Sequence, residues 1–254
     1  MTKELKLSPE ADILTRVASY LPNDGSDSVH FHNNSHLSFV IKGGGTIRSK
    51  SETWERLPGN LIFAYAGEPH QCVAKEFPTV NMNMEVGLGF LRANHLTEAS
   101  VENSVRKNPN AKLLMLKIYK EVFYSDDCSS ASIKILLFDL IGDAHLSDHD
   151  RPIWVGRIYE LMNDRWNESL SLEDLAQASG VHPVTVSKYF RKYFGCTFGE
   201  YVRRVRIERS LSIIKNSSAS LTEIGYECGF YDQSHFSRTF RRLTGFSPKS
   251  YASL

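Results

Sequence analysis

Long cationic side chains stand at matching positions of two similar segments near the end of the chain. Lys188 follows Val186 by two residues, and Arg238 follows Phe236 by the same interval. On a helix whose apolar residues face a core, cations at this interval lie on the opposite, exposed face. Such donors can hydrogen-bond to base edges in the major groove of DNA, to guanine above all. These residues could therefore bind a polyanion and distinguish its sequence.

Three histidines offer a different chemistry. His30-Phe-His32 and the later His70 could hold a transition metal, because cupin enzymes bind metal through an H-x-H pair, a carboxylate and a later histidine. The carboxylate is missing, since residues 33–36 are Asn-Asn-Ser-His. We therefore predict that no metal is bound and that these histidines line or cap a barrel. No nucleophile–base pair or phosphate-binding glycine loop appears, so we predict no catalytic residue, no cofactor and no enzyme.

The segments around Lys188 and Arg238 belong to a repeat. A stretch that starts with Leu172-Glu-Asp-Leu175 returns 49 residues later as Leu221-Thr-Glu-Ile224. Beyond the glycine that follows each stretch, the interval becomes 50 residues and the agreement continues. The matched pairs there are Val186 and Phe236, Lys188 and Arg238, Phe190 and Phe240, Arg191 and Arg241, and Gly195 and Gly245.

Each copy has the order of a helix-turn-helix motif. Gly180 and Gly229 stand where the chain must turn sharply, which favours glycine because φ is positive there. The second helix of each copy should run over about residues 183–194 and 233–243, with one apolar and one basic face. Two capping-box patterns begin the first helices: Ser171 with Asp174, and Ser220 with Glu223.

A third capping box, Thr197 with Glu200, predicts a long helix that ends at about Lys215. With a rise of about 1.5 Å per residue, this helix spans roughly 27 Å. That length can hold two recognition helices about one DNA turn apart, in successive major grooves. Asp232 is the expected N-cap of the second recognition helix, and Pro183 fits the first turn of the first one.

The second copy runs without a break through Ile224-Gly-Tyr-Glu-Cys-Gly-Phe-Tyr-Asp-Gln-Ser-His-Phe-Ser-Arg-Thr-Phe-Arg-Arg-Leu-Thr-Gly-Phe-Ser-Pro-Lys-Ser-Tyr251. This stretch is similar over its whole length to the signature of the AraC/XylS family of transcription regulators. One departure is Gly225, where the family usually has alanine. The resemblance covers residues 153–254, and it implies an activator that binds double-stranded DNA and acts with RNA polymerase.

The outer faces of the two recognition helices carry the residues expected to contact DNA. Side chains near the helix N-termini are placed for base edges, and those near the helix ends for phosphates. The expected base-edge set is Val184, Thr185, Ser187 and Lys188, with Gln233, Ser234, His235, Ser237 and Arg238. The expected phosphate set is Arg191, Lys192, Arg241 and Arg242.

The first half of the chain changes from strand to helix patterns. Residues 29–90 show short apolar runs separated by glycine and proline, which is typical of an antiparallel sandwich or barrel. Helices are expected over Ala111–Tyr124 and Ser129–Leu146, the latter with an apolar stripe from Ile133 to Ala144. They either pack on the barrel or also pair two subunits. The expected strands are Leu37–Lys42, Thr46–Ser49, Thr53–Leu57, Leu61–Ala66 and Gln71–Ala74, with Gly43-Gly44-Gly45 as a turn.

This half resembles, more loosely, the arm and cupin-like barrel of the same family. The residues that support this resemblance are His30-Phe-His32, Pro58-Gly59 and Gly67-Glu-Pro-His70. The resemblance implies a ligand cavity and a helical pair that serves a homodimer. Candidate lining residues are Trp54, Tyr65 and His70, because aromatic and imidazole groups suit small polar ligands. Packing in the core is the alternative for each of the three.

Charge and cysteine usage narrow the class of protein. Residues 151–254 carry 15 Lys and Arg against 10 Asp and Glu, whereas residues 1–150 carry 15 against 19. The basic half fits contact with a polyanion. The four cysteines are far apart, as expected of reduced packing residues. No apolar run approaches the roughly 20 residues of a membrane span, and the start lacks a secretory signal, so we expect a cytoplasmic protein without a membrane partner.

Together these patterns predict an α+β chain. Residues 1–146 form a cupin-like antiparallel β-barrel with a helical pair, for ligand sensing and dimerisation. Residues 147–152 form a linker, and residues 153–254 form an all-α domain with two helix-turn-helix motifs joined by a long helix. The leading hypothesis is a regulator controlled by a small-molecule effector. The alternatives are a regulator that is ligand-independent or controlled by a protein partner, and, less favoured, a metal-dependent cupin enzyme fused to a DNA-binding domain.

Overall fold

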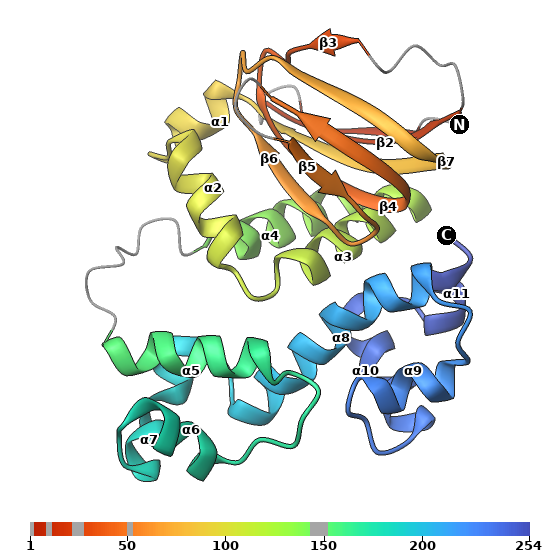
Figure 1. Ribbon diagram of the computed structural model, residues 1–254. Coiled ribbons are helices and arrows are strands. Elements are labelled where there is room, and N and C mark those ends of the chain that lie inside the picture. The colour runs from red at the N-terminus through yellow and green to blue at the C-terminus, as the bar shows by residue number, and fades with distance from the viewer. Residues whose placement is uncertain (1–2, 9–11, 22–27, 50–52, 143–151) are drawn as a thin grey trace. The chain divides into compact units, whose positions relative to one another are not determined.

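The computed structural model describes residues 3–8, 12–21, 28–49, 53–142 and 152–254 (Figure 1). The chain divides into two compact units, Met1–His145 with Leu254, and Leu146–Ser253. Of the expected linker at residues 147–152, only Pro152 lies within the described residues.

The first unit contains a seven-stranded sheet in which every pairing is antiparallel. The pairing path is β1-β2-β7-β4-β5, while β3 pairs with β7 and β6 pairs with β4. Among the described residues this path ends at β1 and β5, so the expected closed barrel is not shown. The strands are β1 (Lys3–Ser8), β2 (Ile13–Tyr20), β3 (Val29–His30), β4 (Ser35–Arg48), β5 (Thr53–Arg56), β6 (Leu61–Ala64) and β7 (His70–Val86).

The glycine run 43–45 lies inside β4, so its prediction as a turn between two strands is wrong. The register against β7 shifts at three places between Val40 and Gly45. Gly43 has a φ of +70°, and a Cβ there would stand 2.7 Å from the backbone oxygen of Pro78. At Gly45 a Cβ would stand 2.0 Å from the oxygen of Val73. Only glycine allows this close approach, and the resulting bulges bend a single long strand.

The bend gives β4 and β7 two different sets of neighbours. Before it, β4 pairs with β6 and with the second half of β7; after it, β4 pairs with β5 and with the first half of β7. Because successive side chains of a strand alternate between its faces, β4 and β7 present one apolar face and one polar face. Leu37 and Phe39 pair with Met84 and Met82, and all four are fully buried.

Helices cover part of this sheet. α3 (Ala111–Tyr124) has the predicted bounds, and it packs together with α4 (Ser129–Ile141) against β1 and β2 (Figure 1). Packing on the sheet is thus confirmed for both, whereas pairing of two subunits stays a prediction. Residues 143–146, including Ala144 of the predicted stripe, lie outside the described part of the chain. Two further helices, α1 (Leu88–Ala93) and α2 (Glu98–Lys107), precede them.

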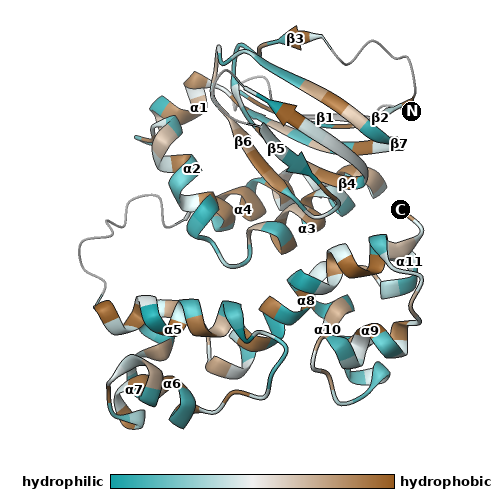
Figure 2. Cartoon of the chain, viewed as in Figure 1, coloured by the Kyte–Doolittle hydropathy of each residue, from teal (hydrophilic) through white to brown (hydrophobic). Residues whose placement is uncertain are grey.

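The second unit is helical throughout, as predicted. Brown and teal segments alternate along α5 and α8 in Figure 2, as expected of helices with one apolar face. The first motif closes around a core that includes Ile158, Leu175, Val186 and Phe190. The helices are α5 (Ile153–Asp164), α6 (Leu172–Ser179), α7 (Pro183–Phe194), α8 (Phe198–Asn216), α9 (Leu221–Glu227), α10 (Gln233–Thr244) and α11 (Pro248–Ala252).

The cysteines differ in how far they are buried. Cys196 and Cys228 are buried, and burial raises the pKa of the Cys228 thiol to about 12. Cys128 is exposed at the N-cap of α4, so its prediction as a packing residue is wrong.

A search of the described helices for a stretch long and apolar enough to cross a membrane finds none.

Candidate nucleic-acid interface and ligand cavity

The capping pattern that predicted the helix-turn-helix motifs is confirmed at every position. Ser171, Thr197 and Ser220 each accept a hydrogen bond from the backbone N–H three residues on, and the acid there accepts one in return. Asp232 caps α10 by accepting from the N–H of His235 at 2.7 Å. Gly180 and Gly229 have φ values of +73° and +75°, as the sharp turns require. These local bonds fix where each helix of the two motifs begins and ends.

In the first motif, α7 buries one face and exposes the other. Val186 and Phe190 are buried, whereas Val184, Ser187, Lys188, Arg191 and Lys192 are exposed and Thr185 is half-buried. The ammonium of Lys188 lies 5.3 Å from the centroid of the Tyr189 ring, which is within the range of a cation–π interaction. Pro183 occupies the first turn, as predicted. The predicted contact residues thus form one continuous exposed face.

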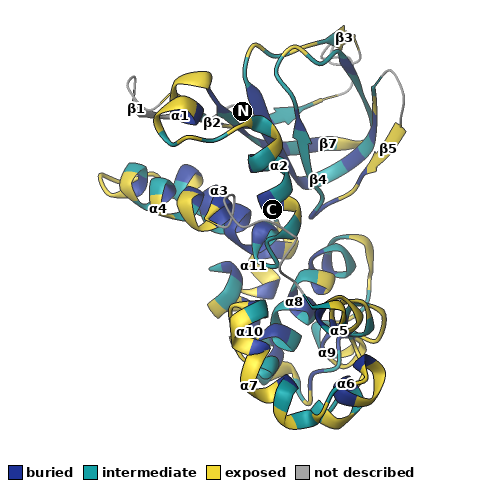
Figure 3. Ribbon diagram, turned by 90° about the vertical axis from the view of Figure 1, so that its left-hand side faces the viewer, coloured by how far each residue is buried: buried dark blue, intermediate teal, exposed yellow. Residues whose placement is uncertain are grey.

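In the second motif, α10 has the same division (Figure 3). Phe236 and Phe240 are fully buried. Gln233, Ser234, Arg238, Arg241 and Arg242 are exposed, while His235 and Ser237 are half-buried. The His235 ring packs edge-on against Phe230 at 5.2 Å, and the amide oxygen of Gln233 accepts from Thr222 at 3.0 Å. These two side chains therefore have partners within the motif, whereas Arg238 is exposed on the outer face of α10.

Arg206 connects parts of the second unit in a way that sequence reasoning missed. Its guanidinium donates to three backbone oxygens, those of Trp166 at 3.3 Å, Glu168 at 2.8 Å and Gly229 at 2.5 Å. Burial lowers the pKa of this group. The side chain extends from α8 to the loop before α6 and to the turn of the second motif, so it links the two motifs. In the sequence, nothing distinguishes Arg206 from the other arginines of the same helix.

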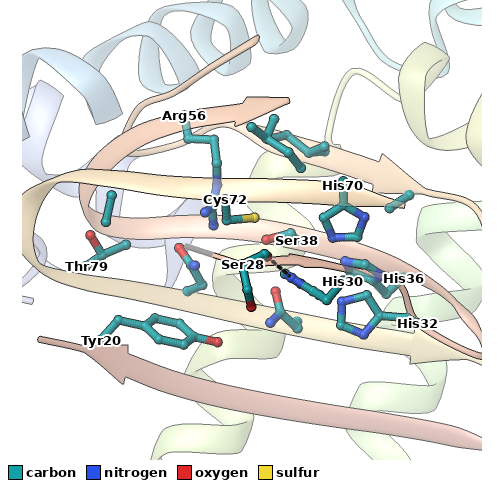
Figure 4. Close-up of a pocket in the computed structure, with 16 residues that line it drawn as sticks. Tyr20, Ser28, His30, His32, His36, Ser38, Arg56, His70, Cys72 and Thr79 are labelled. Atoms are coloured by element: carbon teal, nitrogen blue, oxygen red, sulfur yellow. Dashed lines mark hydrogen bonds between the residues drawn. The ribbon is translucent and has the colours of Figure 1, made fainter. Parts of the chain in front are cut away.

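The first unit contains a cavity of about 300 Å³ lined by strands on both sides of the bend (Figure 4). Polar side chains line part of its wall: His36 and Ser38 of β4 face it together with Asn81 and Asn83 of β7. Several of these polar atoms are buried without a hydrogen-bond partner. They are Nδ1 of His36, Nε of Arg56, and Oδ1 of Asn81 and of Asn83. Because an unpaired buried polar atom is costly, this set fits a polar ligand or ordered water in the cavity.

Four imidazole rings gather at one end of this cavity, while Tyr20 and Thr79 lie at the other (Figure 4). His30 pairs with His70 across β3 and β7, and their ring centroids are 4.6 Å apart. His32 stacks on His70 at 5.3 Å and meets His36 at 4.1 Å. Burial and the neighbouring imidazoles lower the pKa of His32, and burial lowers that of His36 to about 3. These two rings are therefore neutral near pH 7.

Of the three residues predicted to line a ligand site, the structure brings Trp54 and His70 to one hollow, whereas Tyr65 lies outside it. His70 is buried on the wall of the cavity. Trp54 is not among the residues lining that cavity, but it borders an adjoining hollow of about 340 Å³ that shares Ile47 and His70 with it. Tyr65 lines neither of the two; its hydroxyl donates to Glu102, which raises the pKa of Tyr65 to about 12. The prediction missed the asparagines, because nothing in an isolated strand tells which face meets a cavity.

Comparison with known proteins assigns both units. Residues 14–140 match the AraC-like ligand binding domain, and residues 175–253 match a helix-turn-helix domain. The chain is 32% identical over 207 residues to the uncharacterized HTH-type transcriptional regulator YijO of Escherichia coli K12, covering 77% of this chain and 73% of that protein.

Two further similarities cover different shares of the chain. It is 32% identical over 102 residues to the HTH-type transcriptional activator RhaS of Escherichia fergusonii, spanning 40% of this chain and only 37% of that one. The crystal structure of ToxT from Vibrio cholerae aligns with 95% of this chain and with 97% of the ToxT chain, at 14% identity and a TM-score of 0.40. From its two matched domains and its similarity to YijO, the chain belongs to the AraC/XylS family of transcription regulators, with an N-terminal ligand-binding domain and a C-terminal DNA-binding domain.

Proposed function

We propose that α7 and α10 enter successive major grooves on one side of a DNA duplex. The observation that supports this most is that two motifs with matching exposed faces are joined by one helix, α8, which contacts both recognition helices. With 19 residues and a rise of about 1.5 Å each, α8 is roughly 28 Å long. This is close to the roughly 34 Å that separates neighbouring turns of a major groove.

Within this arrangement, Lys188 and Arg238 would read base edges, and the cations toward the helix ends would contact phosphates. Both side chains are exposed and lie in the first half of their helix. A bidentate contact to guanine is worth about 1–3 kcal/mol of discrimination, whereas phosphate contacts strengthen binding without regard to sequence. Val184, Thr185, Ser187, Gln233, Ser234, His235 and Ser237 complete the proposed base-edge set. Arg191, Lys192, Arg241 and Arg242 form the phosphate set.

The first unit would sense a small polar effector in the cavity rather than act as an enzyme. The unpaired atoms of Arg56, Asn81 and Asn83 support this, because hydroxyl, carbonyl or carboxylate groups of a ligand could satisfy them. His70 belongs to the same wall, and Trp54 and Tyr65 would act from the adjoining surface. By analogy with the activator RhaS, the protein would activate transcription with RNA polymerase, as a homodimer in the cytoplasm.

Selection from a pool of random duplexes with the full-length protein tests the DNA-reading proposal. We expect a site with two elements about 10 base pairs apart, one for each recognition helix. Lys188→Ala should relax the preference in one element only, and Arg238→Ala in the other, each costing about 1–3 kcal/mol. Lys117→Ala, with the same change of charge in the first unit, should keep both elements. One enriched element, or the loss of both from either variant, would contradict the two-helix reading.

Thermal unfolding with a panel of small polar metabolites tests the sensing proposal. A bound effector should raise the melting temperature in proportion to the logarithm of its concentration. Asn83→Leu should abolish this shift, because it removes a cavity-facing polar atom while keeping a side chain of similar size. If no metabolite in the panel changes the melting temperature or the DNA affinity, the alternative of a regulator without a small-molecule ligand, or one controlled by a protein partner, gains support.

A further inference from the structure

Three of the clustered histidines are brought together by strand pairing rather than by an isolated loop. His30 and His70 are direct partners in the ladder between β3 and β7, so their side chains share one face of the sheet. His32 follows His30 by two residues. One ring nitrogen from each of the three can be chosen so that all lie within 4.8 Å of one another. Within the described chain, this is the one group of histidines, cysteines and acids that meets such a test.

The hydrogen bonds of two rings leave the other nitrogen available as a ligand. Nδ1 of His30 lies 3.0 Å from the oxygen of Ser28, and Nδ1 of His70 lies 3.0 Å from the oxygen of Glu68. A carbonyl can only accept, so each Nδ1 carries the proton and each Nε2 keeps a free lone pair. Histidines that bind metals usually donate their second ring nitrogen to a carbonyl or carboxylate in this way, which fixes the tautomer and the ring orientation.

A structural role for the rings accounts less well for this arrangement. A packed histidine pairs both nitrogens with protein groups, or turns one toward bulk water. Here His70 is 4% exposed, and the rings meet one another at one end of a cavity (Figure 4). With their Nδ1 protons donated to these carbonyls, His30 and His70 present only the acceptor nitrogen Nε2 to the neighbouring rings. A cation is the partner that satisfies several such acceptors at once.

Although the missing carboxylate argued against a metal here, we propose that His30, His32 and His70 bind a divalent transition-metal ion through their free ring nitrogens, with the remaining coordination positions open toward the cavity. Imidazole ligands suit Zn²⁺, Ni²⁺, Co²⁺ and Cu²⁺, whereas Mg²⁺ and Ca²⁺ prefer oxygen. With zinc–nitrogen bonds of about 2.1 Å, tetrahedral ligand atoms stand roughly 3.4 Å apart. Small side-chain rotations would therefore bring the three nitrogens from their present spacing to the ion. This site is independent of the proposed DNA reading, since metal binding needs no DNA.

The test is a metal titration of the full-length protein after dialysis against a chelator and then against chelator-free buffer. Competition with a chromophoric chelator gives the stoichiometry and affinity for Zn²⁺, and the visible spectrum of bound Co²⁺ reports the coordination geometry. We expect one tight equivalent of Zn²⁺ per chain, a spectrum typical of a four- or five-coordinate ion, and no comparable binding of Mg²⁺. A chain that binds no Zn²⁺ or Co²⁺ under these conditions would overturn the proposal.

Variants decide whether these histidines hold the ion. His30→Gln and His32→Gln change half-buried residues, and each should lower the Zn²⁺ affinity at least about 10-fold and alter the Co²⁺ spectrum. His70→Gln should do the same, with circular dichroism confirming that the buried substitution leaves the fold intact. His95→Asn is the matched control: His95 is exposed, away from the cluster, and has a φ of +54° that asparagine tolerates. Equal affinity in His32→Gln and in the control would assign the bound metal to other residues.

Discussion

At the residue scale, two glycines of the second motif have opposite requirements. Gly229 has a φ of +75°, and a Cβ there would stand 2.5 Å from the oxygen of Asn167 and 2.8 Å from Cζ of Arg206. Gly225 lies within α9, where a Cβ would meet only the Phe236 side chain, at 3.4 Å or more. The first position needs glycine for its backbone and for close approach, whereas the second has room for the alanine that is usual in this family.

Gly225→Ala should therefore stabilise the protein, by about 0.5–1 kcal/mol, because alanine loses less backbone entropy than glycine on entering a helix. Gly229→Ala is the contrasting variant, and it should destabilise the protein by more than the first gains. Urea unfolding followed by circular dichroism measures both. A destabilising Gly225→Ala would show that the space beside Phe236 does not accept the new methyl group.

Arg206 is the residue on which the link between the two motifs depends. Arg206→Met keeps much of the aliphatic stem but removes all three donors, which leaves the carbonyls of Trp166, Glu168 and Gly229 without this partner. We expect a loss of about 2–4 kcal/mol in the free energy of unfolding, since bonds to a charged donor are worth more than neutral ones. Arg209→Met, on the exposed face of the same helix, should change stability by less than about 0.5 kcal/mol. Equal effects of the two would refute the linking role.

At the element scale, the helix starts of the second unit depend on carboxylates. The N–H groups of Ser171, Thr197 and Ser220 donate to Asp174, Glu200 and Glu223 at 2.7–2.9 Å. These hydrogen bonds hold the pKa of each carboxyl below its usual value. A carboxyl whose pKa is lower in the folded than in the unfolded state stabilises the fold above its unfolded pKa. That contribution is lost as the pH falls through the folded pKa.

Acid should therefore weaken the second unit through these three caps. Between about pH 5 and about pH 3, the wild type should lose more stability than a variant carrying Asp174→Asn, Glu200→Gln and Glu223→Gln, because the variant has no charge to lose there. Glu173→Gln is the control, since Glu173 is an exposed acid of the same first turn outside the capping box. Melting temperatures across this range measure the difference. Parallel curves for wild type and triple variant would show that the caps do not depend on charge.

The elements also show what could be predicted from the sequence. Helix starts were predictable because a cap is a local interaction within four residues, and α6, α8 and α9 begin directly after the predicted caps. Strands β1 and β2 were not predicted, because their pairing with each other and with β7 brings together residues far apart in the chain. The same holds for the bend at Gly43 and for the asparagines of the cavity. Their role depends on what the neighbouring strand brings close, which no local pattern contains.

At the scale of the whole molecule, the uneven distribution of charge predicts how steeply DNA binding depends on the salt concentration. The net excess of Lys and Arg lies in residues 151–254, and four of these cations stand in the last turns of α7 and α10. Each phosphate contact releases counterions, so the logarithm of the binding constant falls with the logarithm of the salt concentration, with a slope of about −0.9 per contact. The size of that slope therefore counts the phosphate contacts.

Replacing Arg191, Lys192, Arg241 and Arg242 together by glutamine should reduce the slope by up to about 4 and weaken binding to all duplexes alike. The preferred sequence should stay the same, because base edges are contacted elsewhere. The control removes four charges from the acidic first unit, at Arg92, Lys117, Lys120 and Lys134. Equal slopes in the two variants would mean that overall charge, rather than the ends of α7 and α10, attracts the DNA. A changed sequence preference in the first variant would instead mean that one of the four replaced cations contacts a base edge rather than a phosphate.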